Sequence, residues 1–412
     1  VTYDYKNRYL TEFNMGYNGS ENFPEGKRFG FFPSVSLGWV GTEEPFFPEN
    51  DLLTFMKLRG SYGEVGNDKI GGKRYLYLNG SYSLVDGGHQ HVVFGEAGTN
   101  MDRYKLYREG DIGNPDVTWE RAKKLNIGAD MKFFANKLSL TVDYFTEKRD
   151  NILWQLSTVP ELVAASLPAA NIGKVENYGY EAEIGYRDKI ATVDYWIKGT
   201  YSFARNKIIF KDEPPRPYEW LLATGRPVDQ YFGLTFEGFY NSWDEINDPQ
   251  RPVSQWEGGG LQPGDMKYKD LNGDGKITTD DMGAIRHSNW PEITYSFSAG
   301  CAWKGFDLSV LFQGTEDVSV SYASAAAYPF TADWGSAQKW HTERWTAERY
   351  ANGDKITFPR LVLSPDKQHN YQPSSFWVQD ASYLRLKNVE LGYRFTTDVM
   401  KKIGLESMRI FV

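Results

Sequence analysis

The stretch from Asp270 to Asp281 contains the side chains whose types and spacing point most directly to chemistry. It reads DLNGDGKITTDD, so oxygen-bearing side chains stand at positions 1, 3 and 5, and Gly275 stands at position 6, where a calcium loop needs a sharp turn. Ca²⁺ takes about six to eight oxygen ligands, which acidic and amide side chains on a tight loop can supply. The predicted ligands are Asp270, Asn272, Asp274, the backbone carbonyl of Lys276, Thr278 and Asp281.

This loop differs in two ways from a helix–loop–helix calcium site. Position 12 is Asp281, which is shorter than the usual glutamate and reaches less easily as a bidentate ligand. The flanks at 264–268 and 283–285 show no amphipathic helical pattern. The alternative is a solvated turn rich in Asp and Asn that holds no metal. We expect a structural Ca²⁺ that fixes a long loop leading into the next strand.

Apolar and polar side chains alternate from 293 to 303, and again from 306 to 312 after a turn at Lys304-Gly305. A period of two predicts a tight β-hairpin with one apolar face. Similar alternation recurs along the chain at 12–18, 34–39, 56–62, 125–133, 138–144, 178–187, 193–203 and 388–395. The fold class predicted from this pattern is all-β.

Composition excludes several classes of protein. The 412 residues carry a net charge of −8 from 46 basic and 54 acidic side chains, without a basic tract, so a nucleic-acid partner is not expected. The one cysteine, Cys301, cannot form an intrachain disulfide, and its place on an apolar face predicts a packing role. No segment reads as a transmembrane helix or signal peptide. Because both ends of the chain show strand-like patterns, we expect an internal fragment of a longer protein.

The connections between the predicted strands alternate in length. Short turns are expected at 6–8, 135–137, 188–191 and 304–305, and long connections at about 66–116, 155–170, 211–290 and 315–375. Two connections on the side of the short turns, 41–54 and 396–406, are of medium length. Outer-membrane barrels have short periplasmic turns and longer extracellular loops, and aromatic girdles that would suit the 16% aromatic content.

We therefore predict a transmembrane antiparallel β-barrel, with residues 1–412 forming part of a larger barrel, because lipid requires a closed sheet. Residues 66–116, 211–290 and 315–375 are its predicted long extracellular loops, and the calcium loop lies in the second of them. The alternative architecture is a secreted all-β sandwich with long surface loops.

The barrel interpretation assigns different environments to the two faces of each strand. Arginine should be costly at Leu140 or Ile184, on the apolar face that meets outer-membrane lipid. Changes at Asp143 or Glu183, on the polar face, are expected to be mild.

No arrangement of residues predicts catalysis. The five histidines, His89, His91, His287, His341 and His369, lack metal-ligand spacing, and the sequence contains no nucleophile elbow or phosphate-binding loop. A second candidate site is the segment 328–350, where aromatic residues that could stack on sugars or anchor a protein interface lie beside basic ones. Its predicted contact residues are Tyr328, Trp334, Trp340 and Trp345. The alternative is a loop folded on its own aromatic core.

Six stretches together carry a resemblance to a known family. They are RFGFFPSVSLGW at 28–39, LRGSYGEVGN at 58–67, NPDVTWE at 114–120, NIGKVENYGYE at 171–181, the loop at 270–281 and GFDLS at 305–309. They span nearly the whole chain, and the sequence resembles the SusC/RagA-type TonB-linked outer-membrane transporters of Bacteroidetes.

This resemblance implies a barrel of about 22 strands, an N-terminal plug with a TonB-binding segment, and a SusD-like surface lipoprotein that acts as a hinged lid. The implied function is TonB-dependent active import of oligosaccharides or peptides across the outer membrane, and the implied class is a transporter, not an enzyme. No plug or TonB box is expected within residues 1–412, so this fragment alone should not transport. The alternatives are a secreted calcium-binding adhesin, a carbohydrate-binding β-protein and a surface glycosidase.

Overall fold

The computed structural model describes residues 1–48, 50–69, 74–80, 112–158, 168–324, 327–330, 335–363, 369–395, 404–405 and 407–412, and the backbone of four short strands between 83 and 108. Twelve strands form one sheet in the order β1-β2-β3-β4-β9-β10-β11-β12-β19-β20-β23-β24. Their bounds are β1 Thr2–Tyr5, β2 Tyr9–Gly19, β3 Phe29–Val40, β4 Leu53–Asn67, β9 Glu120–Phe133, β10 Leu138–Trp154, β11 Ala170–Ile190, β12 Val193–Phe210, β19 Ile293–Trp303, β20 Phe306–Glu316, β23 Tyr383–Arg394 and β24 Arg409–Phe411. The all-β prediction is confirmed.

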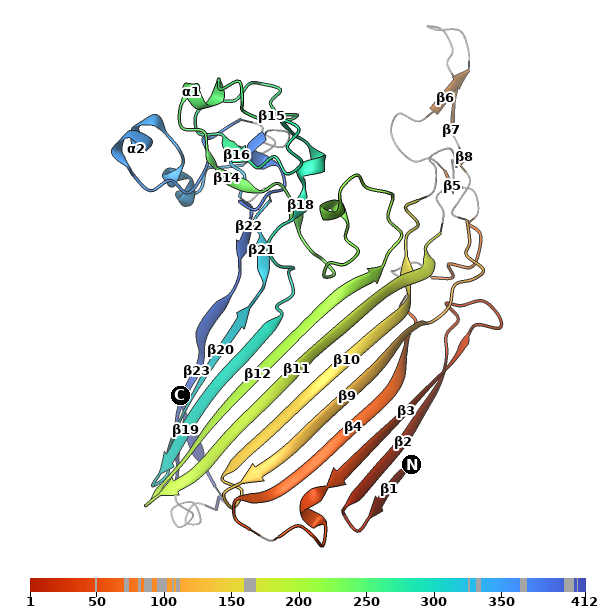
Figure 1. Cartoon of the computed structure of the whole chain (residues 1–412), viewed down its shortest axis with the longest axis vertical. Helices are drawn as coiled ribbons and strands as arrows, with labels where there is room; N and C mark the ends of the chain where they lie inside the picture. The colour runs from red at the N-terminus through yellow and green to blue at the C-terminus, as the bar shows by residue number, and fades with distance from the viewer. Residues whose placement is uncertain are drawn as a thin grey trace. The chain divides into compact units, whose positions relative to one another are not determined.

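The chain divides into two compact units, the first comprising Val1–Ile184 with Asn206–Pro214 and the second Gly185–Arg205 with Pro215–Val412. In the first unit, β1, β2, β3, β4, β9 and β10 lie side by side in one sheet (Figure 1). The predicted alternation places apolar side chains on one face, and many of them are exposed: Met15 is 70% exposed and Ile127 is 55% exposed. A continuous exposed apolar face suits lipid better than water.

The tight turns lie where the sequence predicts them. Lys6 and Asn7, between β1 and β2, have φ angles of 55° and 56°, and the turn between β19 and β20 uses Lys304 and Gly305. The turn predicted at 188–191 is shifted, because β11 continues to Ile190 and the turning residue is Ala191, with φ of 55°. At each turn the left-handed backbone reverses the chain within a few residues.

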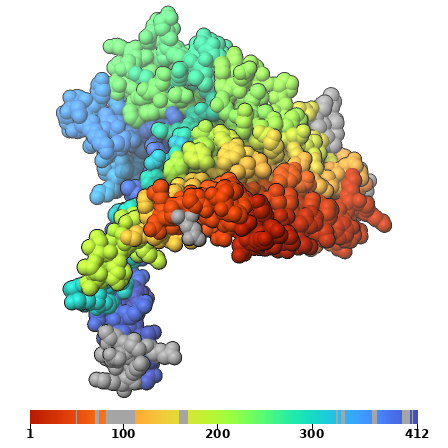
Figure 2. Space-filling model, turned by 60° about the horizontal axis from the view of Figure 1, so that its bottom comes forward, coloured from red at the N-terminus to blue at the C-terminus, as the bar shows by residue number. Residues whose placement is uncertain are grey.

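In the second unit, the two long connections that follow β12 and β20 fold together into one body, which we call the loop body. Its atoms are green and blue in Figure 2, and residues of both connections form one buried core. The core residues are Leu234, Met266, Tyr268, Ile277, Phe358, Tyr371 and Trp377. Both connections supply members of this core, so the two loops stabilise each other.

Short elements organise the connections. Among the described residues, the α-helices are α1 Trp243–Ile246 and α2 Ala347–Asn352, and the 3-10 helices are η1 Gly41–Glu43, η2 Glu219–Leu221, η3 Thr279–Asp281, η5 Lys339–Glu343 and η7 His369–Tyr371. The paired short strands are β5 Ser83–Leu84 with β8 Tyr107–Arg108, β6 His91–Phe94 with β7 Asp102–Lys105, β13 Phe232–Gly233 with β18 Gly283–Ala284, β14 Phe236–Phe239 with β16 Met266–Tyr268, β15 Val253–Ser254 with β17 Lys276–Ile277, and β21 Ser319–Ser321 with β22 Val378–Asp380.

Cys301 is exposed on β19, so the predicted packing role is wrong: its side chain lies on the outer apolar face and not in a protein core. Within the described residues, no helix has the length and apolar character needed to cross a membrane.

Candidate functional site

The predicted calcium loop is closed by hydrogen bonds from its own backbone. The Asp270 carboxylate accepts the N–H groups of Gly273 at 2.7 Å and Gly275 at 2.8 Å. Both glycines have left-handed backbones, with φ of 74° and 78°, which allows the chain to wrap around the carboxylate. At the far end, Asp281 is fully buried and accepts the N–H groups of Leu271 and Thr278, each at 2.8 Å.

The remaining predicted ligands take part in the same turn. Asn272 accepts the N–H of Asp274 at 3.1 Å, and Asp274 accepts the N–H of Lys276 at 2.8 Å. The hydroxyl of Thr278 accepts the N–H of Asp280 at 3.1 Å at the start of η3. Every predicted side-chain ligand therefore has a backbone partner, and the presence of Ca²⁺ stays a prediction.

Two aromatic side chains support this loop from η2 and its preceding residue. Tyr218 and Trp220 stack with ring centroids 4.4 Å apart. Trp220 donates its indole N–H to the Asp280 carbonyl at 2.8 Å, and Asn272 donates to the Tyr218 hydroxyl at 3.2 Å. The loop is thus anchored at both ends by a stack that the spacing of its acidic residues does not reveal.

We expect Asp274→Ala to lower Ca²⁺ affinity by more than about 10-fold, since one carboxylate of a small oxygen site is lost together with its hydrogen bonds to the Lys276 N–H and the Asn272 amide. Isothermal titration with CaCl₂ measures the affinity, and the exposed Asp354 outside the loop gives a matched control as Asp354→Ala. Equal affinity in both variants, or no saturable binding by the unmodified protein, would contradict the prediction.

The predicted contact residues of segment 328–350 separate into packing and surface positions. Tyr328 packs edge-on against Tyr371 and Trp377, with centroids 4.7 and 4.8 Å apart, and burial raises its pKa to about 12. Trp345 is only 8% exposed and donates its indole N–H to Asn241 at 3.1 Å. For these two residues the predicted contact role is replaced by packing in the loop's own core.

Trp340 remains a candidate for partner or cargo contact, because it is 53% exposed on η5. Trp334 lies outside the described residues. Close by, the bond from Trp345 to Asn241 links the segment before α2 to the segment before α1. A fixed scaffold therefore presents the exposed indole of Trp340 at the surface of the loop body.

A buried polar cluster, missed from the sequence, links the two long connections. Asp265 binds the guanidinium of Arg360, with its Oδ1 2.6 Å from Nε, and also accepts from the side-chain amide of Asn370 at 2.7 Å. Asn370 in turn accepts the N–H of Met266 at 2.8 Å. These partners are about 100 residues apart in the chain, so spacing along the sequence gives no signal for them.

Two histidines are also buried in the loop body. The His369 ring lies 2.9 Å from the Ser254 hydroxyl and 2.7 Å from the Met266 carbonyl. Burial lowers its pKa, and the Met266 hydrogen bond and the charges of Asp265 and Glu257 oppose this shift. His341 accepts the N–H of Gln338 at Nδ1, and burial lowers its pKa as well. Burial therefore favours the neutral form of both rings.

The loop body should lose stability in acid. An unfolded histidine has a pKa of about 6.5. Below that pH the unfolded segment binds more protons than the folded one, so the free energy of unfolding falls as pH decreases. We expect limited proteolysis to cleave between 339 and 378 faster at pH 5 than at pH 7.5, and His369→Gln to reduce that difference. Cleavage that does not depend on pH, measured with a protease of constant activity, would contradict this prediction.

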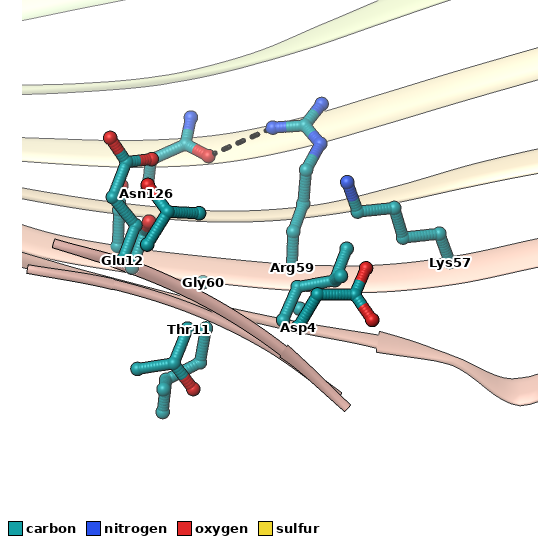
Figure 3. Close-up of a pocket in the computed structure, with 13 residues that line it drawn as sticks. Asp4, Thr11, Glu12, Lys57, Arg59, Gly60 and Asn126 are labelled. Atoms are coloured by element: carbon teal, nitrogen blue, oxygen red, sulfur yellow. Dashed lines mark hydrogen bonds between the residues drawn. The ribbon is translucent and has the colours of Figure 1, made fainter. Parts of the chain in front are cut away.

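A second feature is a hollow of about 350 Å³ on the polar face of β1 to β4 and β9. Glu12, Lys57, Arg59 and Asn126 are among the residues that line it, and Figure 3 shows Arg59 directed at the amide oxygen of Asn126, 3.3 Å away. Polar side chains of both charges at a concave surface can hydrogen-bond a polar solute or another polar protein surface.

Arg59 holds three strands together on this face. Its guanidinium forms two hydrogen bonds to Asp143, at 2.6 and 2.7 Å, and a third to Asp130 at 3.1 Å. Gly128 lies opposite both Arg59 and Asp143 in the register, and a Cβ there would approach the guanidinium carbon to 2.8 Å. The expectation that Asp143 tolerates change is therefore not supported, since its loss removes a bidentate partner.

Comparison with known proteins agrees with this architecture. The family described as TonB dependent receptor-like, beta-barrel matches residues 1–410. TonB-dependent receptor P3 of Formosa agariphila is 29% identical and covers 100% of this chain, which spans 39% of that protein. TonB-dependent receptor SusC of Bacteroides thetaiotaomicron is 25% identical over 98% of this chain, which spans 38% of that protein.

Among solved structures, the RagAB peptide transporter matches with a TM-score of 0.71 at 19% identity, covering 100% of this chain and 42% of that chain. The likeness shows the fold, and the chain spans about two fifths of the length of the relatives that it matches. The strand order, the exposed apolar faces and the match over nearly every residue lead to one assignment. The chain belongs to the TonB-dependent receptor-like β-barrel family of the outer membrane and is of the SusC/RagA type.

Proposed function

We propose that this chain supplies barrel wall and outer loops to a TonB-dependent active importer that works with a SusD-like surface lipoprotein and carries oligosaccharides or peptides. TonB would act through a part of the protein outside residues 1–412. The wall offers a polar inner face, where Arg59 and its carboxylate partners are fixed, and an apolar face that contacts lipid. The chain's own contribution is to bind and guide cargo, with no bond chemistry.

The observation that carries the proposal is the folded loop body. Long loops of low stability would make a poor docking surface, because ordering them on binding costs free energy. Here two connections share the core around Trp377 and the buried cluster of Asp265 and Arg360, so their surface is preorganised. Trp340 is exposed on this body, and tryptophan is enriched among residues that dominate protein interfaces.

The family assignment supports this proposal over the alternatives. A secreted adhesin or a secreted carbohydrate-binding protein would not belong to an outer-membrane barrel family. The family consists of transporters, which gives no support to a surface glycosidase.

We expect Trp340→Ala to weaken binding of the surface lipoprotein by about 10-fold or more, because a central indole commonly contributes over about 2 kcal/mol to an interface. The measurement is the amount of lipoprotein that co-purifies from outer membranes with the tagged protein, together with uptake of the cargo. Trp303→Ala is the matched control, since this tryptophan is 48% exposed at the turn end of β19.

The two readouts separate the roles of Trp340. Loss of lipoprotein binding supports a lid contact, whereas normal binding with reduced uptake supports direct contact with cargo. Unchanged binding and unchanged uptake would return the whole segment 328–350 to a packing role. Barrel assembly, followed by the heat-dependent shift in gel mobility, should be the same for both variants.

A further inference from the structure

Three side chains with metal-binding atoms converge where the chain enters β19 and leaves β20. They are His287, Glu292 and Asp317, and one ligand atom from each lies within 4.8 Å of the other two. The His287 Nε2 atom is 3.5 Å from Asp317 Oδ1. Among the residues that the structure describes, these three are the histidine, cysteine or acidic side chains that lie close enough together to share one ion.

The backbone fixes the spacing of this group. The N–H of His287 donates to the Ser319 hydroxyl at 3.1 Å, and the N–H of Ser319 donates to the Ser288 carbonyl at 2.9 Å. Asp317 has a left-handed backbone, with φ of 55°, a conformation that aspartate tolerates better than most residues. The segment before β19 is thus tied to the segment after β20 whether or not an ion is present.

Arg205 orients the third side chain. Its Nε and Nη2 atoms donate to the same oxygen of Glu292, Oε2, at 2.8 and 2.5 Å. The other oxygen, Oε1, receives neither of these bonds, so the carboxylate can bind an ion through Oε1 while Arg205 holds Oε2. A ligand carboxylate anchored by an outer hydrogen bond is a common arrangement at metal sites.

Access and charge both suit a cation. The side chains of His287 and Asp317 are 49% and 36% exposed, so an ion can enter from solvent, whereas that of Glu292 is 10% exposed. The carboxylates of Glu292 and Asp317 attract a cation, and Arg205 only partly offsets their charge.

We propose that His287, Glu292 and Asp317 bind one divalent transition-metal ion of the Zn²⁺ class. The imidazole nitrogen distinguishes this site from the oxygen-only loop at 270–281, because Ca²⁺ prefers oxygen ligands and Zn²⁺ accepts nitrogen and oxygen. Three protein ligands leave a fourth position for water. The ion would join the connection before β19 to the end of β20 and so hold the base of the loop body.

The test is isothermal titration of the purified protein in detergent with ZnCl₂, in buffer that contains saturating CaCl₂ to fill any calcium site. We expect one saturable Zn²⁺ site, and at least a 10-fold loss of affinity in His287→Ala and in Asp317→Asn. X-ray absorption at the zinc edge should show nitrogen and oxygen neighbours at about 2.0–2.2 Å. Asp354→Asn, which alters an exposed acid of the loop body outside the group, should keep the original affinity.

The outcomes are distinct. Absence of saturable Zn²⁺ binding in the unmodified protein would overturn the proposal, as would binding that His287→Ala and Asp317→Asn leave unchanged. Barrel assembly and tryptophan fluorescence identify a variant that fails to fold. In that case the absorption spectrum of the unmodified protein decides, because a shell without any histidine nitrogen would also overturn the assignment.

Discussion

Replacing Val35 with arginine should lower the free energy of unfolding in lipid by about 2–4 kcal/mol. Val35 lies near the middle of β3, is 39% exposed, and stands between Phe13 of β2 and Tyr62 of β4, which are also exposed and apolar. An arginine at position 35, between these exposed apolar side chains, must enter the hydrocarbon or distort the bilayer to reach water. Urea unfolding of the protein in lipid vesicles measures the change.

Ser36→Arg is the matched control, because Ser36 is the next residue along the same strand and points to the opposite face. It pairs in register with Glu12, whose carboxylate offers the new guanidinium a partner on the polar face. We expect Ser36→Arg to change the free energy by less than about 1 kcal/mol. Equal destabilisation by the two arginines would mean that the faces of β3 are wrongly assigned.

Replacing Trp377 with alanine should destabilise the loop body by about 3–5 kcal/mol. Trp377 is 3% exposed and packs against Tyr328, Tyr371 and Phe358, with ring centroids 4.8, 5.5 and 5.6 Å away. Its indole N–H donates to the Asn370 carbonyl at 2.9 Å, so the substitution also leaves a buried acceptor without its donor. Hydrogen exchange of peptides from 339–363 and 369–380 measures the loss of protection.

The contrast with Trp340→Ala makes this prediction specific. Both variants should lose binding of the surface lipoprotein, but only Trp377→Ala should increase hydrogen exchange throughout the loop body. The twelve-stranded sheet should assemble in each case, because its pairing does not use the side chain of Trp377. If Trp377→Ala leaves exchange unchanged, the shared core does not hold the two connections together.

The strands of the barrel wall could be predicted from the sequence, because the alternation of apolar and polar residues in each strand reflects the environments of its two faces. A period of two identifies a strand and also its lipid face, as at Val35 and Ser36, since neighbouring side chains point in opposite directions. Turns were visible for a similar reason: Lys304-Gly305 joins two alternating segments directly. The shift of one turn to Ala191 could not be predicted, because the end of β11 depends on pairing with a neighbour.

Tertiary packing determines which side chains of the long loops are buried, and this could not be predicted from the sequence. Trp340 and Trp345 are five residues apart and chemically identical, yet one is exposed and the other buried, because only the second reaches Asn241 on a distant segment. Likewise, the cluster of Asp265, Arg360 and Asn370 brings together residues whose partners are about 100 positions away. Local spacing can predict a turn such as 270–281, but it cannot predict which side chains a long loop buries.

The short parallel pair of β15 and β17 has a consequence for how the protein responds to its surroundings. The N–H groups of Val253 and Gln255 donate to the carbonyls of Gly275 and Ile277, at 2.9 and 3.0 Å, and the intervening Ser254 contacts His369. Backbone hydrogen bonds and the contact between Ser254 and His369 therefore link the acidic turn to the buried imidazole. By thermodynamic reciprocity, if a cation in the turn opposes protonation of His369, acid weakens the affinity for that cation by the same factor.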